Sequence, residues 1–152
     1  MGCDIHTSCE RNVNGRWIAV NVNPEAFDWR SYGLFGFLAD VRNYSFVPPL
    51  APQRGVPSDV CPETIDHIGL GDYHSCSWIA MSELLSFDYD KTFEDRRTTA
   101  QIAPNAWYGA ADAGKGNGFI TTFRDFLGRG FFEELKRLQA AGVERIVFGF
   151  DS

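Results

Sequence analysis

The first ten residues alternate in character, and this alternation is the strongest constraint on how the chain folds. An extended chain sends successive side chains to opposite faces. One face would carry small, mostly apolar side chains, those of Cys3, Ile5, Thr7 and Cys9. The other face would carry the polar side chains of Asp4, His6, Ser8 and Glu10. We predict a first strand that buries one face and presents an imidazole between carboxylates on the other.

Turn residues and apolar alternation predict two more strands. Asn14-Gly15 is a sequence typical of a tight hairpin turn, and the segment from Arg16 to Val22 after it is strand-like. Near the other end of the chain, apolar residues alternate from Val143 to Phe150. We expect this last strand to pair with the first strand or to lie close to it.

Apolar residues at helical spacing predict three helices. The first covers residues 33 to 42. The second would begin at Trp78, with Ser77 as its N-cap. The third would run from Thr121 to Gly142, with a break at the glycines of residues 128–130. Each helix would bury one apolar stripe against the rest of the chain.

Two long segments show neither helical nor strand periodicity. Residues 47 to 62 hold five prolines in sixteen residues, a density that neither a helix nor a central strand tolerates. Residues 90 to 118 are polar and rich in glycine, and we predict a long loop there. The sequence therefore predicts one α+β domain over residues 1–152. A small, mainly antiparallel sheet, made of the N-terminal hairpin and the C-terminal strand, would be packed by two or three helices and joined by irregular loops.

Composition limits the partners that this chain can have. The 152 residues carry a formal net charge of −6, which disfavours tight binding to duplex nucleic acid. No run of about 18 apolar residues occurs, so we expect no membrane-spanning helix. The spacing of the four cysteines matches no standard zinc pattern and favours free thiols in a cytosolic protein.

Two Asp-x-His motifs offer groups for catalysis or metal binding. In the first strand, Asp4 and His6 would project from one face, about 7 Å apart at the backbone. A second pair, Asp72 and His74, precedes the second predicted helix. Together the four residues form a possible ligand set for zinc or manganese. His6, His74 and Asp72 are the candidate catalytic groups, and the alternative for the first pair is a structural hydrogen bond near a strand end.

Four other residues are candidates for binding a ligand. Arg54, in the proline-rich loop, and Arg42 offer planar guanidinium groups to a phosphate or a carboxylate. Each of them has the alternative of a surface salt bridge. Tyr73 could stack on a base, and Ser75 offers a hydroxyl in the second motif. The other candidate stacking residues are Trp29, Tyr44 and Trp107.

A set of short motifs in the first part of the chain points to a family. The motifs are Met1-Gly-Cys-Asp-Ile-His6 with Glu10, Arg42-Asn-Tyr44, Arg54-Gly-x-Pro57-x-Asp59, and Asp72-x-His-Ser-x-Ser-Trp78 with Glu83. Together they resemble a family of small bacteriophage-encoded proteins that start with Met-Gly-Cys-Asp-Ile-His, over about residues 1 to 90. The chain departs from that family at Cys76, where many members carry a second histidine. This departure weakens the metal hypothesis or makes Cys76 a replacement ligand. The resemblance implies a phage or prophage origin and a setting in the host cytoplasm, and it implies no activity.

Three functions are compatible with these residues. The first is a ligand-binding protein with a polar Asp, His and Arg pocket. It would sequester a small phosphate-containing ligand of the nucleotide type, or it would inhibit a host defence protein complex. The second is a small hydrolase that acts on a phosphate-containing substrate with a divalent metal, with Arg54 neutralising the developing charge. The third is a phage accessory or structural protein without chemistry, and the oligomeric state stays open in all three.

Overall fold

The computed structural model describes residues 2–102 and 112–152, and it confirms the predicted α+β class. Within these residues the helices accompany two antiparallel sheets, one of four strands and one of two. The chain divides into two compact units. The first unit comprises residues 1–30, 51–87 and 129–152, and the second comprises residues 31–50 and 88–128. A single domain over the whole chain stays a prediction.

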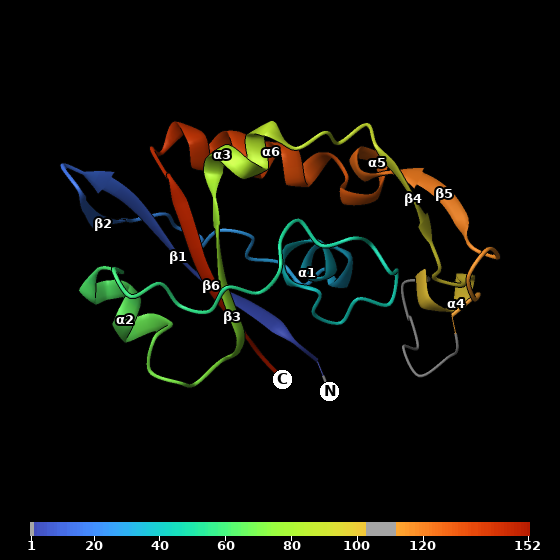
Figure 1. Ribbon diagram of the computed structural model, residues 1–152, viewed down its shortest axis with the longest axis horizontal. Helices are drawn as coiled ribbons and strands as arrows, with labels where there is room; N and C mark the ends of the chain where they lie inside the picture. The colour runs from blue at the N-terminus through green and yellow to red at the C-terminus, as the bar shows by residue number, and fades with distance from the viewer. Residues whose placement is uncertain (1, 103–111) are drawn as a thin grey trace. The chain divides into compact units, whose positions relative to one another are not determined.

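The first unit is built on a four-stranded antiparallel sheet in the order β2-β1-β6-β3. Its strands are β1 (Asp4–Val13), β2 (Arg16–Val20), β3 (His74–Ala80) and β6 (Arg145–Asp151). Figure 1 shows the start of β1 beside the end of β6, as their antiparallel pairing requires. The predicted hairpin and the predicted pairing of the first and last strands are therefore confirmed.

The turn between β1 and β2 forms because Asn14-Gly15 can adopt left-handed backbone angles. The φ values of these residues are 52° and 85°, as the tight turn of a two-residue hairpin requires. The alternation predicted for the first strand is also confirmed, since one face of it lies in the core. That face carries Cys3, Ile5, Thr7 and Cys9. A slip of one residue would expose this whole face, so its burial fixes the register of β1 against β6.

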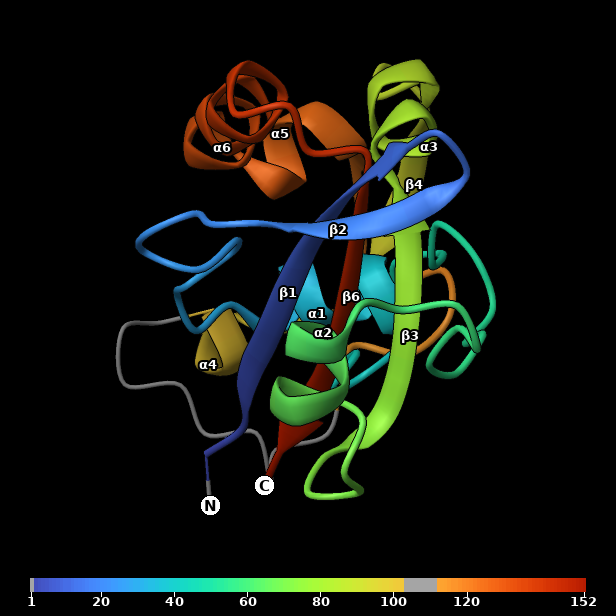
Figure 2. The same cartoon turned by 90° about the vertical axis from the view of Figure 1, so that its left-hand side faces the viewer.

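Helix α2 (Pro62–His67) lies across the other, polar face of β1, and Figure 2 shows it in front of the sheet. The carboxylate of Glu10 fixes the amino end of this helix on β1. It accepts hydrogen bonds from the N–H of Cys61 and from the hydroxyl of Thr64, both at 2.8 Å. The last residue of α2 consequently lies near His6, with 6.3 Å between the two ring centroids.

The prediction that a helix begins at Trp78 is wrong. Trp78 lies in β3, and α3 (Met81–Ser86) begins only after that strand ends. Ser77 is not an N-cap, because its hydroxyl accepts a hydrogen bond from the N–H of Arg54 at 2.9 Å. Trp78 pairs with Val147 of the buried strand β6, so sheet pairing outweighs the local helical spacing.

The third predicted helix is confirmed together with its break, but its predicted start is wrong, because Thr121 belongs to the strand β5 (Phe119–Thr122). Gly128, with φ of 81°, separates α5 (Phe123–Leu127) from α6 (Arg129–Ala140). The apolar stripe predicted for this segment consists of Phe131, Phe132, Leu135 and Leu138. Helix α6 buries three of these residues in the first unit, and Phe132 is half-buried.

The second unit holds α1, α4, α5 and a two-stranded sheet. Its helices besides α5 are α1 (Tyr32–Ala39) and α4 (Thr99–Ile102), and its strands are β4 (Thr92–Asp95) and β5 (Phe119–Thr122). The loop predicted over residues 90–118 is therefore wrong in part, because it contains β4 and α4. Elements of four residues are too short to show a period in the sequence.

Short helices also explain why the sequence underestimates the number of helices. The described ranges contain six helices, where two or three were predicted. Three of the six, α2, α3 and α4, have only four to six residues. Helices α2 and α4 lie outside the predicted helices, and α3 begins later than predicted. The proline-rich segment is free of helix and strand from Val47 to Cys61, as predicted, but its last residue, Pro62, begins α2. No helix within the described ranges is long and apolar enough to cross a membrane.

Candidate functional site

His6 and Asp151 meet where β1 starts and β6 ends. His6 Nε2 lies 2.7 Å from Asp151 Oδ2, and the N–H of Asp4 donates to Asp151 Oδ1 at 3.1 Å. Both oxygens of the Asp151 carboxylate are thus held in place. We call His6 and Asp151 the His6 dyad. The sequence predicted His6 but not its partner, because the two residues are 145 positions apart and only the strand register brings them together.

The Asp151 contact determines which nitrogen of His6 carries hydrogen. The hydrogen bond from His6 holds the pKa of Asp151 below its usual range, so Asp151 stays a carboxylate at neutral pH. A carboxylate can only accept hydrogen bonds, so Nε2 donates and the neutral imidazole keeps its lone pair on Nδ1. Among the residues that the structure describes, His6 Nδ1 has no hydrogen-bond partner.

A second histidine lies beside the first and has a carboxylate partner of its own. His67 Nε2 contacts Glu25 Oε1 in a short hydrogen bond, and we call this pair the His67 dyad. Its Nδ1 also lacks a hydrogen-bond partner within residues 2–102 and 112–152. His67 was not predicted as a site residue, although it is one of only three histidines in the chain. It stands outside any Asp-x-His motif, and its helix is too short to be recognised.

Tyr73 joins the two imidazoles into one aromatic cluster. Its ring stacks on His6 with 4.3 Å between centroids and 12° between planes. His67 stands nearly perpendicular to both rings, at 82°, with centroids 6.3 Å from His6 and 6.4 Å from Tyr73. Burial, followed by the nearby carboxylates, raises the pKa of Tyr73, so its hydroxyl stays protonated.

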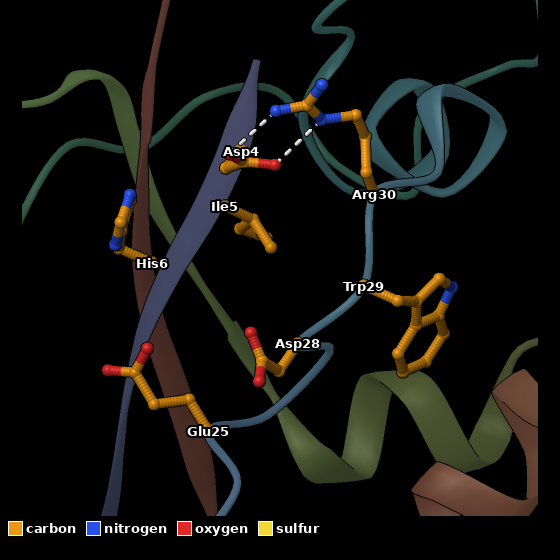
Figure 3. Close-up of a pocket in the computed structure, with 7 residues that line it drawn as sticks. All are labelled: Asp4, Ile5, His6, Glu25, Asp28, Trp29 and Arg30. Carbon is orange, nitrogen blue, oxygen red and sulfur yellow. Dashed lines mark hydrogen bonds and ion pairs between the residues drawn. The ribbon is translucent and has the colours of Figure 1, made fainter. Parts of the chain in front are cut away.

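A cavity of about 320 Å³ adjoins the His6 dyad, and Figure 3 shows its lining. The lining residues are Asp4, Ile5, His6, Glu25, Asp28, Trp29 and Arg30. In Figure 3 the pair of Asp4 and Arg30 lies at one end and Glu25 at the other, with His6 on β1 between them. A second cavity of about 330 Å³ is lined by His67 and also by Glu25, so Glu25 borders both hollows.

The charges around the first cavity are mostly negative. Three carboxylates, those of Asp4, Glu25 and Asp28, face one guanidinium, that of Arg30. Arg30 donates two hydrogen bonds of 2.8 Å to Asp4, and these bonds hold the pKa of Asp4 below its usual range. Asp28 has no hydrogen bond or ion pair with any described residue, and the indole of Trp29 is 39% exposed. The cavity therefore combines an unpaired carboxylate with an accessible aromatic surface.

The four predicted metal ligands do not form a group in the structure. Asp4 is engaged with Arg30, and His6 is engaged with Asp151. His74 uses both ring nitrogens elsewhere, Nδ1 with the hydroxyl of Ser75 at 3.0 Å and Nε2 with that of Ser152 at 2.8 Å. Asp72 makes no hydrogen bond or ion pair with any described residue. In the part of the chain that the structure describes, no three His, Cys, Asp or Glu side chains are placed to hold a metal.

The two predicted phosphate-binding arginines are engaged within the protein. The guanidinium of Arg54 donates to both carboxylate oxygens of Glu83 at 2.8 and 2.6 Å, and it lies 4.5 Å from the ring centroid of Trp78. Arg42 belongs to the second unit, where its guanidinium lies 5.6 Å from the ring centroid of Tyr32. The salt bridge given as the alternative is therefore found for Arg54, whereas the contact of Arg42 is with an aromatic ring. The predicted stacking residue Trp107 lies outside the described residues.

The chain was compared with family models, curated proteins and solved structures. No family model, curated protein or solved structure matches the chain.

Proposed function

We propose that this protein binds a small ligand through a positively charged ammonium or guanidinium group, which enters the cavity beside His6. The observation that carries this proposal is the lining of that cavity, where three carboxylates face one guanidinium. Within residues 2–102 and 112–152, Asp28 has no hydrogen bond or ion pair and is the available acceptor in this set. A cavity of about 320 Å³ lies in the size range of small-molecule sites, roughly 300 to 1,000 Å³.

The indole of Trp29 supports a cationic ligand in a second way. The face of an indole attracts cations, and such contacts contribute about 0.5 to 1 kcal/mol at exposed sites. Trp29 is the large aromatic side chain in the lining, and it follows Asp28 directly in the sequence. A cation held by the Asp28 carboxylate would therefore share its cavity with an aromatic surface, that of Trp29.

A phosphate-containing ligand has less support than the sequence suggested. Its two predicted anchors, Arg42 and Arg54, are engaged with other side chains. The cavity carries an excess of negative charge that would repel a phosphate. An arginine or lysine side chain of a host protein has the same chemistry as a small cation. Inhibition of a host defence complex, in the host cytoplasm and by a phage-encoded protein, therefore remains within the proposal.

Calorimetric titration with agmatine, a small molecule that carries both an ammonium and a guanidinium, tests the proposal. We expect Asp28→Asn to weaken agmatine binding about threefold to fivefold, the effect of one exposed charge pair. The matched control is Asp66→Asn, which removes another exposed carboxylate, on α2 and outside both cavities. It should bind agmatine like the wild type. Equal affinity of the wild type and Asp28→Asn, or binding of inorganic phosphate at least as tight as that of agmatine, would contradict the proposal.

A further inference from the structure

The two histidine dyads share one arrangement that the binding proposal does not use. In each dyad a carboxylate engages the Nε2 atom, through Asp151 for His6 and through Glu25 for His67. In each, Nδ1 is without a hydrogen-bond partner among the described residues. A carboxylate that holds one ring nitrogen fixes both the tautomer and the orientation of the imidazole, and it stabilises the imidazolium that forms on proton uptake.

The two imidazoles lie close enough together to act on one bound substrate. Their ring centroids are 6.3 Å apart, and a general acid or base acts on its substrate from about 3 Å. Both side chains are partly open to solvent, with exposures of 26% and 36%. His6 lines the first cavity and His67 the second, and Glu25 borders both cavities.

We infer that His6 and His67 form a general acid–base pair that hydrolyses a small ester. His6 would be the base and His67 the acid, because His67 occupies the last turn of α2, where the helix dipole favours a positive charge. His6 Nδ1 takes a proton from water, and the oxygen of that water forms a bond to the acyl carbon. The bond from the acyl carbon to the leaving oxygen then breaks, and His67 Nδ1 gives its proton to that oxygen. The products are a carboxylic acid and an alcohol, and exchange with solvent restores both imidazoles.

Tyr73 acts on this pair as a positioning residue. Its ring covers one face of His6 at a centroid distance of 4.3 Å, so it restricts rotation of the imidazole about the Asp151 hydrogen bond. The carboxylates around the pair disfavour an anionic substrate. The choice of a cationic ester as substrate rests on the proposed function, whereas the acid–base pair rests on the two dyads alone.

Hydrolysis of two glycine esters tests the assignment of both roles. The probes are glycine p-nitrophenyl ester, whose leaving group needs no proton, and glycine ethyl ester, whose leaving group needs one. We expect His6→Gln to slow both reactions about 100-fold, the usual contribution of a general base. His67→Gln should slow the ethyl ester by a similar factor and the p-nitrophenyl ester by much less. Asp151→Asn, which keeps the shape of the dyad and removes its charge, should slow both esters while its thermal unfolding stays cooperative.

Each outcome separates the two proposals. The acid–base pair is overturned if the wild type hydrolyses the glycine esters no faster than an equal concentration of free imidazole. It is also overturned if both histidine variants keep the wild-type rates. Turnover that is equally fast with neutral p-nitrophenyl acetate supports the pair and contradicts the cationic ligand. Agmatine binding without ester hydrolysis would support the cationic ligand and overturn the acid–base pair of His6 and His67.

Discussion

The two ends of the β1–β6 strand pair carry similar side chains in different environments. At one end Glu10 lies opposite Arg145, and at the other Asp4 lies opposite Asp151 with His6 beside them. Glu10 and Arg145 are 0% and 4% exposed. The side chains of His6 and Asp151 are 26% and 47% exposed. The same polar face of β1 thus passes from the interior to the surface within a few residues.

At the buried end both charges are paired within the protein, although Arg145 Nη2, 2.7 Å from Glu10 Oε1, makes no hydrogen bond to a described residue. Glu10 accepts hydrogen bonds from Arg145 at 2.7 Å and from the Cys61 N–H and the Thr64 hydroxyl at 2.8 Å. Arg145 also donates to Asp59 at 3.0 Å. At the exposed end, two imidazoles keep a nitrogen without a partner among the described residues, and Asp28 keeps a carboxylate in the same state. Burial forces charges to be paired, so the buried end serves structure, whereas the exposed end has groups left for a ligand.

The largest expected effect lies at the buried end. Arg145→Met would leave the Glu10 carboxylate buried without its cation, and removal of one partner of a buried pair costs about 3 to 5 kcal/mol. We expect a loss of this size in the free energy of unfolding, measured by urea denaturation. The matched change at the exposed end is Arg30→Met, which removes the guanidinium from Asp4. That pair is about half exposed on both sides, so the expected loss is about 1 kcal/mol or less. Equal losses in the two variants would contradict the distinction between the ends.

The loss of unfolding free energy in acid is expected to change less than the stability at neutral pH, and the pKa of Glu10 determines its sign. Burial acts to raise the pKa of Glu10, but the hydrogen bonds from Cys61, Thr64 and Arg145 outweigh it and leave the pKa below its ordinary value of 4.5. A lowered pKa in the folded state contributes stability above the unfolded value, and that contribution is lost as the pH falls through the folded value. Glu10→Gln should therefore lose less stability than the wild type between about pH 7 and about pH 3.

Asp151 provides the comparison for this pH dependence. Its pKa is also lowered, first by the hydrogen bond from His6, so its contribution has the same sign. Because Asp151 is more exposed and more strongly screened, Asp151→Asn should flatten the acid limb of the stability curve less than Glu10→Gln does. The measurement is the free energy of unfolding at several acid pH values. A larger flattening in Asp151→Asn would reverse the assignment of the two ends.

The sequence predicted the framework of the sheet well because its signals are local. The alternation over residues 3–9 and the Asn14-Gly15 turn each determine their own backbone, and the strands follow from them. The start of α3 was misplaced for the opposite reason. The segment around Trp78 has helical spacing, and only its pairing with β6, which is distant in the sequence, makes it a strand. Short elements such as α4 left no period to detect.

The sequence identified some residues of the candidate site and missed others. His6 and Asp4 were identified from their motif, and Tyr73 was identified as an aromatic ligand-binding residue. Asp151, His67 and Glu25 were missed, because they reach His6 only through the strand register and through the anchoring of α2 by Glu10. The second motif was assigned to the same site on its spacing alone. Its His74 instead bonds to Ser75 and Ser152.

Mapping agmatine on the protein by NMR tests the central claim most directly. In a titration of ¹⁵N-labelled protein, we expect the backbone amide shifts to concentrate in residues 4–6 and 25–30, which line the cavity beside His6. Inorganic phosphate at the same concentration should leave these amides unchanged. Agmatine shifts spread over other surfaces, or phosphate shifts confined to residues 4–6 and 25–30, would contradict a cation site at the exposed end of β1.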